Sequence, residues 1–467
     1  MLPKEFAKIP GVEVVYKSHL ELYLKGDADV IGKVKKMLVI ENTGVTKQLQ
    51  QLRTTHPRSP KHAQSIAFRI RELQESQFIT PFAEIDDNTL SVPPGYWYLG
   101  EMVGKDNLSN IKAVTQGDER YYQKEIVEEL LKYKRSSVCA ATGIGKSLVL
   151  RNLAVSYYLA GKKVLICVPS IELLEQTAKK IDEGLVKYGA KCGRLGNGKK
   201  PKDGSRVVIS TIQSAINICD NFDAVCFDEA HTTAAPTYLE VAAGAANAEY
   251  MHGLTATINR PDGLTPLIHA WSGPVVYNYD YRKAVKDEYL SPINYFQKMA
   301  PGVYPYVSNN VTAITQYIKL HSCPTYINYV AQVVKNSLDA GRKTLVLFKS
   351  NECCEALAKV MGCESASGEY RKPLYDFKAG KTNLLIANTI LVGTGIDVPD
   401  ISSIIFCAAG TSEIVFMQSM GRGTRLFPGK KDCIVVDVVP AHHKYIAQGN
   451  IRKAIVAKNI TTQEVSS

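Results

Sequence analysis

Short apolar runs alternate with longer amphipathic stretches through the middle of the chain. The apolar runs lie at residues 137–141, 164–168, 207–210 and 224–227, and the amphipathic stretches between them include residues 147–160 and 172–181. Apolar runs of this length indicate strands buried on both faces, whereas a period near 3.6 indicates helices. Strands that alternate with helices predict a parallel sheet with helices on both faces.

The same alternation starts again after Ser291, and a different pattern precedes residue 113. The later apolar runs lie at residues 344–348, 384–387, 404–407 and 434–438. The first 112 residues combine a β-rich run at 12–16 with a helical stretch near 63–74 and a turn-rich segment at 92–95. We therefore predict an α/β protein in which two tandem parallel-sheet domains, residues 113–290 and 291–467, follow a small α+β domain, residues 1–112.

Composition and charge indicate the kind of partner and the cell compartment. The net charge of +11 favours a polyanion, although such a surplus also serves solubility. Residues 291–467 hold 19 Lys and Arg against 12 Asp and Glu, so much of the surplus lies there. Eleven cysteines without a C-x-x-C pair predict reduced thiols in an intracellular protein. The sequence shows no signal peptide and no membrane-length apolar run, so we expect a cytoplasmic protein with no membrane contact.

One segment has the pattern of a phosphate-binding loop. Residues 140–147 read Ala-Ala-Thr-Gly-Ile-Gly-Lys-Ser between a predicted strand and a predicted helix. Small residues let backbone N–H groups surround the phosphates of a nucleotide, Lys146 reaches the outer phosphates, and the Ser147 hydroxyl suits Mg²⁺. The residues that we expect to line the rest of the loop are Ala141, Thr142, Gly143, Ile144 and Gly145.

Two carboxylates follow the apolar run at 224–227. Asp228 and Glu229 would stand at the carboxyl end of that strand, on the edge of the sheet where nucleotides bind in this class of fold. One carboxylate, Asp228, suits the Mg²⁺ shell, and the other, Glu229, suits the polarisation of an attacking water. We therefore predict ATP as substrate with Mg²⁺ as cofactor. His231 is expected to hydrogen-bond across the nucleotide cleft as a coupling residue and not to act as a base.

The order of these segments resembles a superfamily 2 helicase of the DEAH type, from residue 120 to residue 426. The resemblance implies two RecA-like domains with ATP between them. It assigns adenine contacts to Arg120, Tyr122 and Gln123, and the nucleotide-facing side of the second domain to Gly395 and Asp397. Gln418, Arg422 and Arg425 would complete catalysis from that second domain, with the two arginines on one helix face reaching the γ-phosphate.

The resemblance also implies residues that contact nucleic acid and residues that couple this contact to ATP. Hydroxyl, amide and ammonium groups bind phosphates without reading sequence. The implied nucleic-acid contacts are Pro169, Ser170, Gln176, Thr211, Gln213, Lys349, Ser350 and Thr394. The implied coupling residues are Thr255 and Thr257, together with His231.

Within this superfamily the chain is most similar to phage UvsW-type branch-migration helicases, so the expected partner is branched or forked DNA, in the host cytoplasm if the gene belongs to a phage. The resemblance implies no stable protein partner. The N-terminal block would recognise the DNA substrate through a local basic cluster between Arg53 and Arg71. The aromatic residues 96–98 would either stack on a splayed base or belong to a hydrophobic core.

Three other functions fit parts of this pattern. An RNA-remodelling ATPase is one, because backbone contacts scarcely distinguish DNA from RNA. A restriction-type translocase of double-stranded DNA, with its nuclease on another chain, is the second. A nucleotide-dependent scaffold without turnover is the third, and the presence of Lys146, Glu229, Arg422 and Arg425 argues against it.

Overall fold

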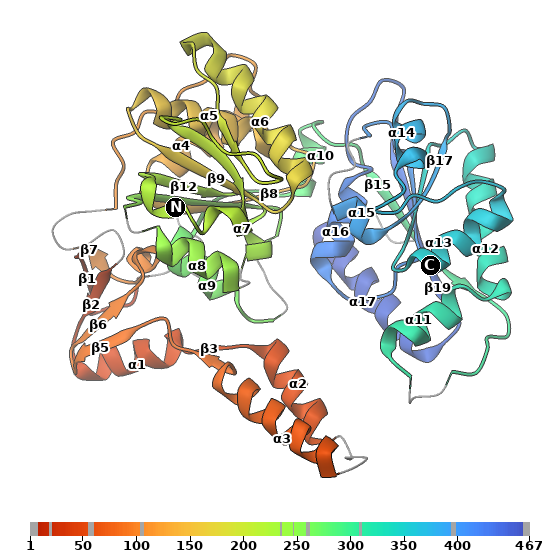
Figure 1. The fold of residues 1–467 in the computed structure, drawn as a ribbon, viewed down its shortest axis with the longest axis horizontal. Coiled ribbons are helices and arrows are strands. Elements are labelled where there is room, and N and C mark those ends of the chain that lie inside the picture. Colours follow the sequence, from red (N-terminus) through yellow and green to blue (C-terminus); the bar gives the residue numbers. More distant parts are fainter. Residues whose placement is uncertain are drawn as a thin grey trace. The chain divides into compact units, whose positions relative to one another are not determined.

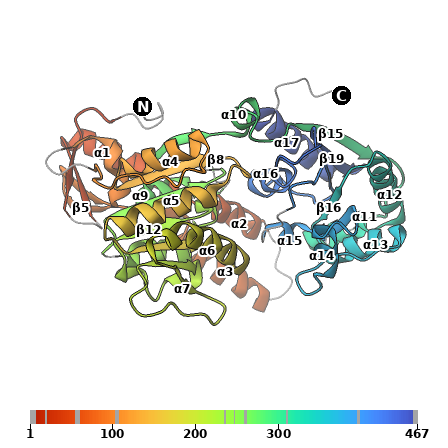
Figure 2. The same ribbon diagram turned by 90° about the horizontal axis from the view of Figure 1, so that it is seen from above.

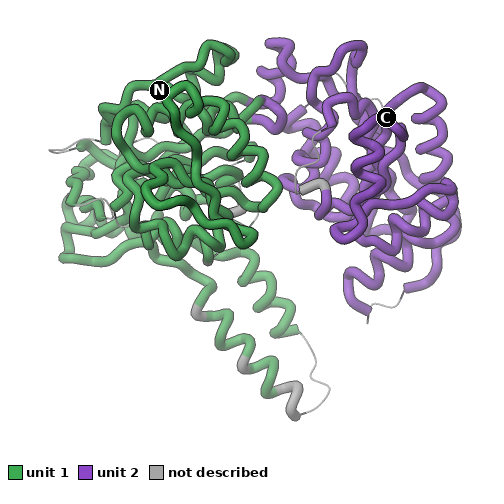
Figure 3. Tube along the Cα trace, turned by 45° about the horizontal axis from the view of Figure 1, so that its top comes forward, with its two compact units in different colours: residues 1–140, 145–279 green, residues 141–144, 280–467 purple. Residues whose placement is uncertain are grey.

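The computed structural model divides the chain into two compact units. It describes residues 8–17, 21–54, 60–102, 107–233, 236–245, 247–257, 262–307, 311–393 and 398–460. The first unit comprises residues 1–140 and 145–279, and the second comprises residues 280–467 with residues 141–144 (Figure 3). The domain boundaries expected near residues 112 and 290 remain predictions. Across the described ranges, no helix is long and apolar enough to cross a membrane.

The first unit begins with a small mixed sheet in the order β5-β6-β2-β1-β7. Its strands are β1 (Glu13–Tyr16), β2 (Leu22–Lys25), β5 (Ala83–Asp86), β6 (Thr89–Val92) and β7 (Glu101–Met102). Only β1 and β7 pair in parallel, and the other neighbours are antiparallel. Helix α1 (Ala28–Leu38) buries Ile31, Val34 and Leu38 in the same core, at the spacing of one helix face. The expected α+β character is confirmed.

A helical arm extends from this sheet (Figure 1). It consists of α2 (Thr43–Arg53) and α3 (Pro60–Glu75), set between the paired short strands β3 (Ile40–Glu41) and β4 (Phe78–Ile79). Among the described side chains of the arm, the buried ones are Leu49 and Leu73. Both helices therefore present most of their surface to solvent.

The larger sheet of the first unit is wholly parallel, in the order β10-β11-β9-β12-β13-β8-β14. Its strands are β8 (Arg135–Ala140), β9 (Val164–Val168), β10 (Gly193–Leu195), β11 (Val207–Thr211), β12 (Ala224–Phe227), β13 (Tyr250–Thr255) and β14 (Val275–Tyr279). Helices α4 (Tyr121–Leu131), α5 (Lys146–Leu159) and α6 (Ile171–Leu185) lie on one side, and α7 (Ile212–Ala215), α8 (Pro236–Gly244) and α9 (Thr265–Ser272) lie on the other (Figures 1 and 2).

The aromatic run at 96–98 joins the two sheets of the first unit. It forms the 3₁₀ helix η2 (Pro94–Leu99), in which all three aromatic side chains are buried. The Trp97 indole N–H donates to the Arg135 carbonyl at 2.9 Å, and the Tyr96 hydroxyl donates to the Pro266 carbonyl at 3.2 Å. A Cβ on Gly95 would lie 2.0 Å from the His269 carbonyl oxygen, so η2 fits directly against α9. The hypothesis that these aromatic residues stack on a splayed base is wrong, because all three side chains are buried in the hydrophobic core.

The second unit contains a parallel sheet in the order β15-β19-β18-β16-β17. Its strands are β15 (Ile293–Ala300), β16 (Thr344–Phe348), β17 (Leu384–Asn388), β18 (Ser403–Phe406) and β19 (Cys433–Pro440). Its helices are α10 (Tyr281–Lys286), α11 (Ala313–His321), α12 (Pro324–Asp339), α13 (Asn351–Met361), α14 (Lys372–Lys378), α15 (Thr389–Gly393), α16 (Glu413–Gly421) and α17 (His443–Asn459). The predicted α/β fold, with two parallel sheets of the RecA-like kind, is confirmed.

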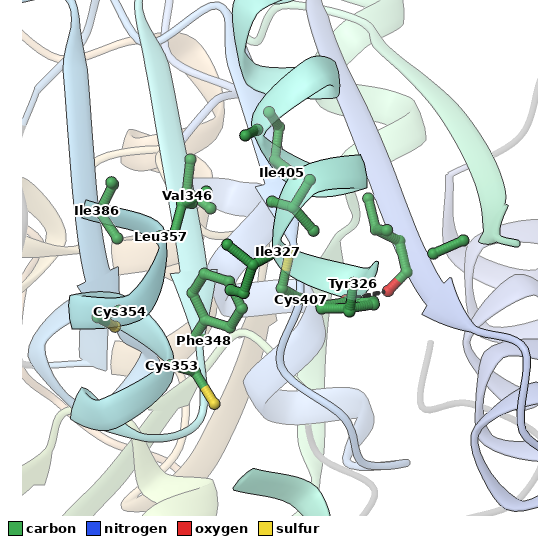
Figure 4. Packing of buried hydrophobic residues seen from close by; sticks show 14 of the residues in the cluster. Tyr326, Ile327, Val346, Phe348, Cys353, Cys354, Leu357, Ile386, Ile405 and Cys407 are labelled. Atoms are coloured by element: carbon green, nitrogen blue, oxygen red, sulfur yellow. Dashed lines mark hydrogen bonds between the residues drawn. The ribbon is translucent and has the colours of Figure 1, made fainter. Parts of the chain in front are cut away.

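Figure 4 shows the core of the second sheet. Tyr326 and Ile327 of α12 pack with Phe348 of β16 and Leu357 of α13, all of them buried. The Tyr326 hydroxyl donates to the Val438 carbonyl at 2.7 Å, which satisfies the one polar group that this side chain brings into the core.

All eleven cysteines lie in described ranges and are free thiols, as the sequence predicts. Nine are buried, Cys139 is half-buried, and Cys363 is exposed. The adjacent pair Cys353 and Cys354 belongs to the core beneath α13, where burial raises the pKa of each thiol to about 12. These thiols act as small hydrophobic side chains.

The joint at η2 gives a first testable prediction. Trp97→Ala should lower the free energy of unfolding of the first unit by about 3–5 kcal/mol, because it removes a buried aromatic and its hydrogen bond. Chemical denaturation followed by circular dichroism measures this. Tyr188→Ala is the control, because Tyr188 is exposed and its loss should change stability by about 0.5 kcal/mol or less. Equal effects of the two substitutions would contradict the structural role of η2.

Candidate ATP-binding site and nucleic-acid contacts

The phosphate-loop sequence forms the connection between β8 and α5. Gly145 is the N-cap of α5 with a φ of 87°, and Gly143 has a φ of 93°. Both values lie in the left-handed region that glycine adopts without strain. Of the other loop residues, Ala141 and Ile144 are buried and Thr142 is half-buried. The loop thus delivers Lys146 and Ser147 at the N-terminus of a 14-residue helix, where backbone N–H groups favour an anion.

Lys146 forms an ion pair with Glu229, the carboxylate expected to polarise the attacking water. Its Nζ lies 3.1 Å from Glu229 Oε1, and both side chains are largely enclosed. Glu229 is one of three non-glycine residues with positive φ in the described ranges, at 50°. Such a conformation costs free energy and is found where the surroundings impose it, often at functional sites. The turn after β12 therefore aims Glu229 at the phosphate loop.

Asp228 is buried beside this pair. Its backbone N–H donates to the Cys167 carbonyl at 2.9 Å, and its Oδ1 accepts the Glu229 N–H at 3.0 Å. Burial, followed by repulsion from Glu229, raises the pKa of Asp228 to about 7, and Lys146 opposes the shift. Lys146 alone does not offset the negative charge of the two neighbouring carboxylates. A divalent cation would therefore be attracted to Asp228.

The donor set fits Mg²⁺ held jointly by the protein, a nucleotide and water. Asp228 supplies a carboxylate and Ser147 a hydroxyl, both of which are oxygen donors that Mg²⁺ prefers. Across the described residues, no group of three or more His, Cys, Asp or Glu side chains is arranged to hold a metal alone. When bound, Mg²⁺ would neutralise phosphate charge at this point.

His231 and Thr255 are brought together, in the same unit. The His231 Nδ1 lies 2.7 Å from the Thr255 hydroxyl, and the Thr255 hydroxyl in turn donates to the Thr257 carbonyl at 2.6 Å. The His231 ring is only 1% exposed and lies 3.4 Å from Glu229 Oε2. This hydrogen bond joins the turn after β12 to β13, and the hydrogen bond expected across the cleft remains a prediction.

The adenine segment lies at the start of α4. Gln123 is 1% exposed, and its amide nitrogen would be 2.5 Å from a Cβ placed on Gly145, so it packs against the phosphate loop. Its Oε1 accepts the Arg120 backbone N–H at 3.0 Å, and the Arg120 guanidinium donates to the Tyr122 hydroxyl at 3.1 Å.

The adenine contact expected of Tyr122 is corrected by the burial of this side chain, which excludes stacking on a base. Its ring is fully enclosed and stacks on Tyr279 with centroids 4.1 Å apart, which leaves no open face for an adenine. The neighbouring Tyr121 is 44% exposed and meets Tyr122 edge-on. Tyr121 is therefore the better candidate for a stacking face. Two adjacent tyrosines occur at this point of the sequence, and the stacking of Tyr122 on Tyr279 decides which of them faces outward.

In the second unit, the chain that carries Arg422 and Arg425 leaves the helix on which both were expected. Residues 423–425, which follow the helix, are called the arginine segment. Helix α16 ends at Gly421, Arg422 is its C-cap, and Arg425 lies beyond it, while Gln418 is on the last turn. The expectation that both arginines share one helix face is therefore wrong. A Cβ on Gly423 would lie 2.2 Å from Cys433 Sγ, so the chain leaves the helix to pass close against β19. Burial lowers the pKa of Arg425, which is half-buried.

Two residues absent from the sequence prediction hold this arginine segment. Lys430 Nζ donates to the Gly423 carbonyl at 2.6 Å and to the Arg425 carbonyl at 2.7 Å. The Ser291 hydroxyl donates to the Arg425 carbonyl at 3.1 Å. These contacts involve backbone atoms, which motifs do not record. The turn-forming Pro428-Gly429 pair, which reverses the chain toward Arg425, was the available signal.

The residues predicted to contact nucleic acid follow the carboxyl ends of their strands. Ser170 and Ser350 are N-caps, of α6 and α13, whose hydroxyls accept from the backbone N–H groups of Leu173 and Cys353. Thr211 is buried and donates to the Ser214 hydroxyl at 3.0 Å. Pro169 is half-buried, whereas the exposed members of the set are Gln176, Gln213 and Lys349. Thr394, Gly395 and Asp397 lie outside the described residues.

Comparison with known proteins gives the family. Residues 116–260 match the model of the type III restriction enzyme res subunit, and residues 326–426 match the helicase conserved C-terminal domain. The first match contains the phosphate loop with Asp228 and Glu229, and the second contains Arg422 and Arg425. The chain belongs to the superfamily 2 helicases, which makes it an ATP-dependent helicase or translocase acting on nucleic acid.

Particular relatives lie at low sequence identity. The chain is 23% identical over 422 residues to the DNA 3′-5′ translocase XPB2 of Sulfurisphaera tokodaii, covering 80% of this chain and 90% of that protein. It is 22% identical to the ATP-dependent DNA helicase uvsW of Enterobacteria phage T4, covering 73% and 72%. A fragment of a putative HsdR subunit of a type I restriction enzyme from Vibrio vulnificus shares the fold, with a TM-score of 0.55, 19% identity and coverage of 72% and 67%.

The Lys146–Glu229 pair gives the second prediction. Glu229→Gln should bind ATP yet lower kcat by about 10²–10⁴, because it removes the group that orients and polarises water. Lys146→Ala should lose turnover through weakened phosphate contact. Steady-state ATP hydrolysis and fluorescent-nucleotide binding measure the two effects. Glu249→Gln is the control, since Glu249 pairs with Lys134 at 2.9 Å immediately before β13 begins. Wild-type turnover in folded Glu229→Gln would exclude the assigned role.

The raised pKa of Asp228 gives the third prediction. Below pH 7 a proton competes with Mg²⁺ for this carboxylate, so apparent Mg²⁺ affinity should increase from pH 6 to pH 8 with release of a proton. In metal-free protein the folded state binds that proton more tightly than the unfolded state, so this group's contribution to stability should fall as pH rises from 3.8 through about 7.

Titration calorimetry in two buffers of different ionisation enthalpy measures the released proton, with Asp228→Asn as the reference. Equal pH dependence of Mg²⁺ binding in both proteins would contradict the role of Asp228.

Proposed function

We propose that this protein is an ATP-dependent DNA helicase or translocase that remodels branched DNA, as in junction migration and fork regression during recombination, repair and replication. The contact between Lys146 and Glu229, beside the buried Asp228, supports the ATP-dependent part. The basic helical arm of α2 and α3 supports the branched-DNA part.

In the proposed reaction, the phosphate loop holds ATP while Glu229 orients the attacking water. Asp228 and Ser147 hold Mg²⁺, and Gln123, Arg120 and Tyr121 contact the base. Arg422 and Arg425 stabilise charge on the transferred phosphoryl group when nucleotide binding draws the second RecA-like domain to the first. Gln418 acts from the last turn of α16. Loss of the γ-phosphate then releases this contact and lets the domains separate.

The strand-end residues would grip one strand of the DNA during this cycle. Gln176, Gln213 and Lys349 are exposed at positions where amide and ammonium groups can bind phosphates. The contacts from Glu229 through His231 to Thr255 would transmit the state of the nucleotide to these DNA-binding residues. These contacts run from the turn after β12 to the end of β13, so a small shift at Glu229 can be passed to Thr255.

The positive charge of the N-terminal block is concentrated on the arm. Residues 43–75 hold six Lys and Arg against two Asp and Glu, whereas the rest of residues 1–114 holds nine against eleven. Lys47, Arg53, Arg69 and Arg71 are all exposed. A near-neutral block thus concentrates its positive charge on two projecting helices, an arrangement suited to the phosphates of a second duplex.

The base of the arm contacts α9 and the segment before it, which flank the larger sheet of the first unit. The Thr43 backbone N–H donates to the Asp262 carbonyl at 2.9 Å, and Ile40 packs with Leu264 and Leu267. These contacts lie a few residues after Thr257. A duplex held by the arm would therefore be tied to the segment that follows the coupling residues.

A second candidate is a restriction-type translocase of double-stranded DNA. The type III restriction model over residues 116–260 and the fold shared with the HsdR fragment favour it. Such a motor has no reason to prefer a junction to a linear duplex, so one substrate series separates the two functions. RNA remodelling would appear in the same series as stimulation by RNA.

The fourth prediction concerns the arm. Lys47→Ala/Arg53→Ala should weaken binding to a four-way junction by about tenfold and reduce the slope of log affinity against log salt by about two, because two phosphate contacts are lost. Binding to single-stranded DNA should change little. Fluorescence anisotropy on a four-way junction, a fork, linear duplex, single-stranded DNA and RNA measures this, alongside ATP hydrolysis with each substrate.

Lys33→Ala/Lys36→Ala is the matched control, because both lysines are exposed on α1 of the same domain. Equal losses for arm and control would exclude the arm as the junction contact. No preference of the wild type for branched over linear DNA would favour the translocase. Removal of the whole N-terminal block is a poorer test, since it would uncover the surface that Trp97 and Tyr96 bury.

A further inference from the structure

The carbonyl groups of the arginine segment, residues 423–425, are all bound by groups from outside it. The Gly423 carbonyl accepts from Lys430 at 2.6 Å, and the Thr424 carbonyl accepts from the Ser291 backbone N–H at 2.6 Å. The Arg425 carbonyl accepts from Lys430 at 2.7 Å and from the Ser291 hydroxyl at 3.1 Å. Carbonyl groups at a helix C-terminus have no partner within the helix, and water is one of the groups that can donate to them.

All three hydrogen bonds of the Lys430 ammonium group are donated to backbone carbonyl groups. Its third acceptor is the Pro399 carbonyl at 3.2 Å, and an ammonium group has three donors. Loss of contact with water on burial lowers the pKa of Lys430. This lysine is therefore a poor candidate for a nucleic-acid contact, and its neighbour Lys431, which is exposed, makes none of these backbone contacts.

The arginine segment is also confined on its other side. Gly423 lies so close to β19 that a Cβ would meet Cys433 Sγ at 2.2 Å. The Thr424 hydroxyl donates to the Gly421 carbonyl at 2.8 Å, which closes the turn after α16. Packing against Cys433 and these hydrogen bonds together restrict the backbone that carries Arg425.

Ser291 connects this segment to the stretch of chain that precedes the second sheet. It lies two residues before β15, and its carbonyl accepts from the Tyr281 hydroxyl of α10 at 3.0 Å. A single residue thus binds α10 through its carbonyl and the arginine segment through its N–H and hydroxyl. A displacement of α10 would reach Arg425 through two hydrogen bonds.

We infer that Lys430 and Ser291 are positioning residues for Arg425, which fix its backbone so that the guanidinium meets the transferred phosphoryl group. This inference rests on the proposed catalytic role of Arg425. A misplacement of about 1 Å at a reacting centre can cost about 10² in rate, so a group that never touches ATP can still control turnover.

The test compares four variants by steady-state ATP hydrolysis and thermal unfolding. Lys430→Met should lower kcat by about 10- to 100-fold with KM for ATP changed by about twofold or less, because binding is retained while alignment is lost. Lys430→Arg should recover part of the loss, since its guanidinium also donates to carbonyls. Ser291→Ala should lower kcat less, and Lys431→Met should leave it unchanged.

A double-mutant cycle separates this inference from the proposed function. In the Arg425→Ala background, Lys430→Met should add little further loss if it acts through Arg425. Full turnover in Arg425→Ala would refute the arginine role itself. A large loss in Arg425→Ala beside wild-type kcat in folded Lys430→Met, or independent losses in the cycle, would overturn the positioning role alone. If Lys430→Met fails to fold, wild-type kcat in Ser291→Ala overturns it.

Discussion

Parallel pairing of β8, β13 and β12 is the constraint on which the candidate site depends. β13 lies between the other two, with Thr255 level with Cys139 and Gly253 level with Phe227. This register ends all three strands at one edge, so Lys146 and Glu229 meet although 82 residues separate them. Their contact spans the end of β13, which places Thr255 and His231 directly beside the pair. A slip in either pairing would separate the phosphate loop from its carboxylates.

The sequence predicts most of the fold because parallel strands buried on both faces leave a simple signature. The run at 224–227 coincides with β12, and the run at 164–168 coincides with β9. The placing of Lys146 and Glu229 in one nucleotide site also follows from the motifs, since each lies just after a strand of one parallel sheet. The place of β13 between them does not follow, because strand order is fixed by long-range packing that no local pattern records.

The errors share a physical origin in tertiary contact. Helix α16 stops at Gly421 because the chain must pass Cys433, and helical periodicity carries no information about that neighbour. Tyr122 faces inward because Tyr279, far along the chain, offers a ring to stack on. Lys430 leaves no motif in the sequence because it binds carbonyl groups, which every residue possesses. Motif residues that touch a ligand are thus easier to find than residues that hold the motif in place.

The distribution of thiols has a practical consequence for measuring motion. Cys363, just after α13, is the one exposed cysteine of the eleven, and ten others are enclosed to different degrees. Burial and the neighbouring Glu364 raise the pKa of Cys363, so a maleimide dye should attach best in mildly alkaline buffer. The unaltered chain therefore carries its own attachment point on the second RecA-like domain. One engineered cysteine on α1 would supply the partner dye for single-molecule distance measurements, without the usual removal of native cysteines.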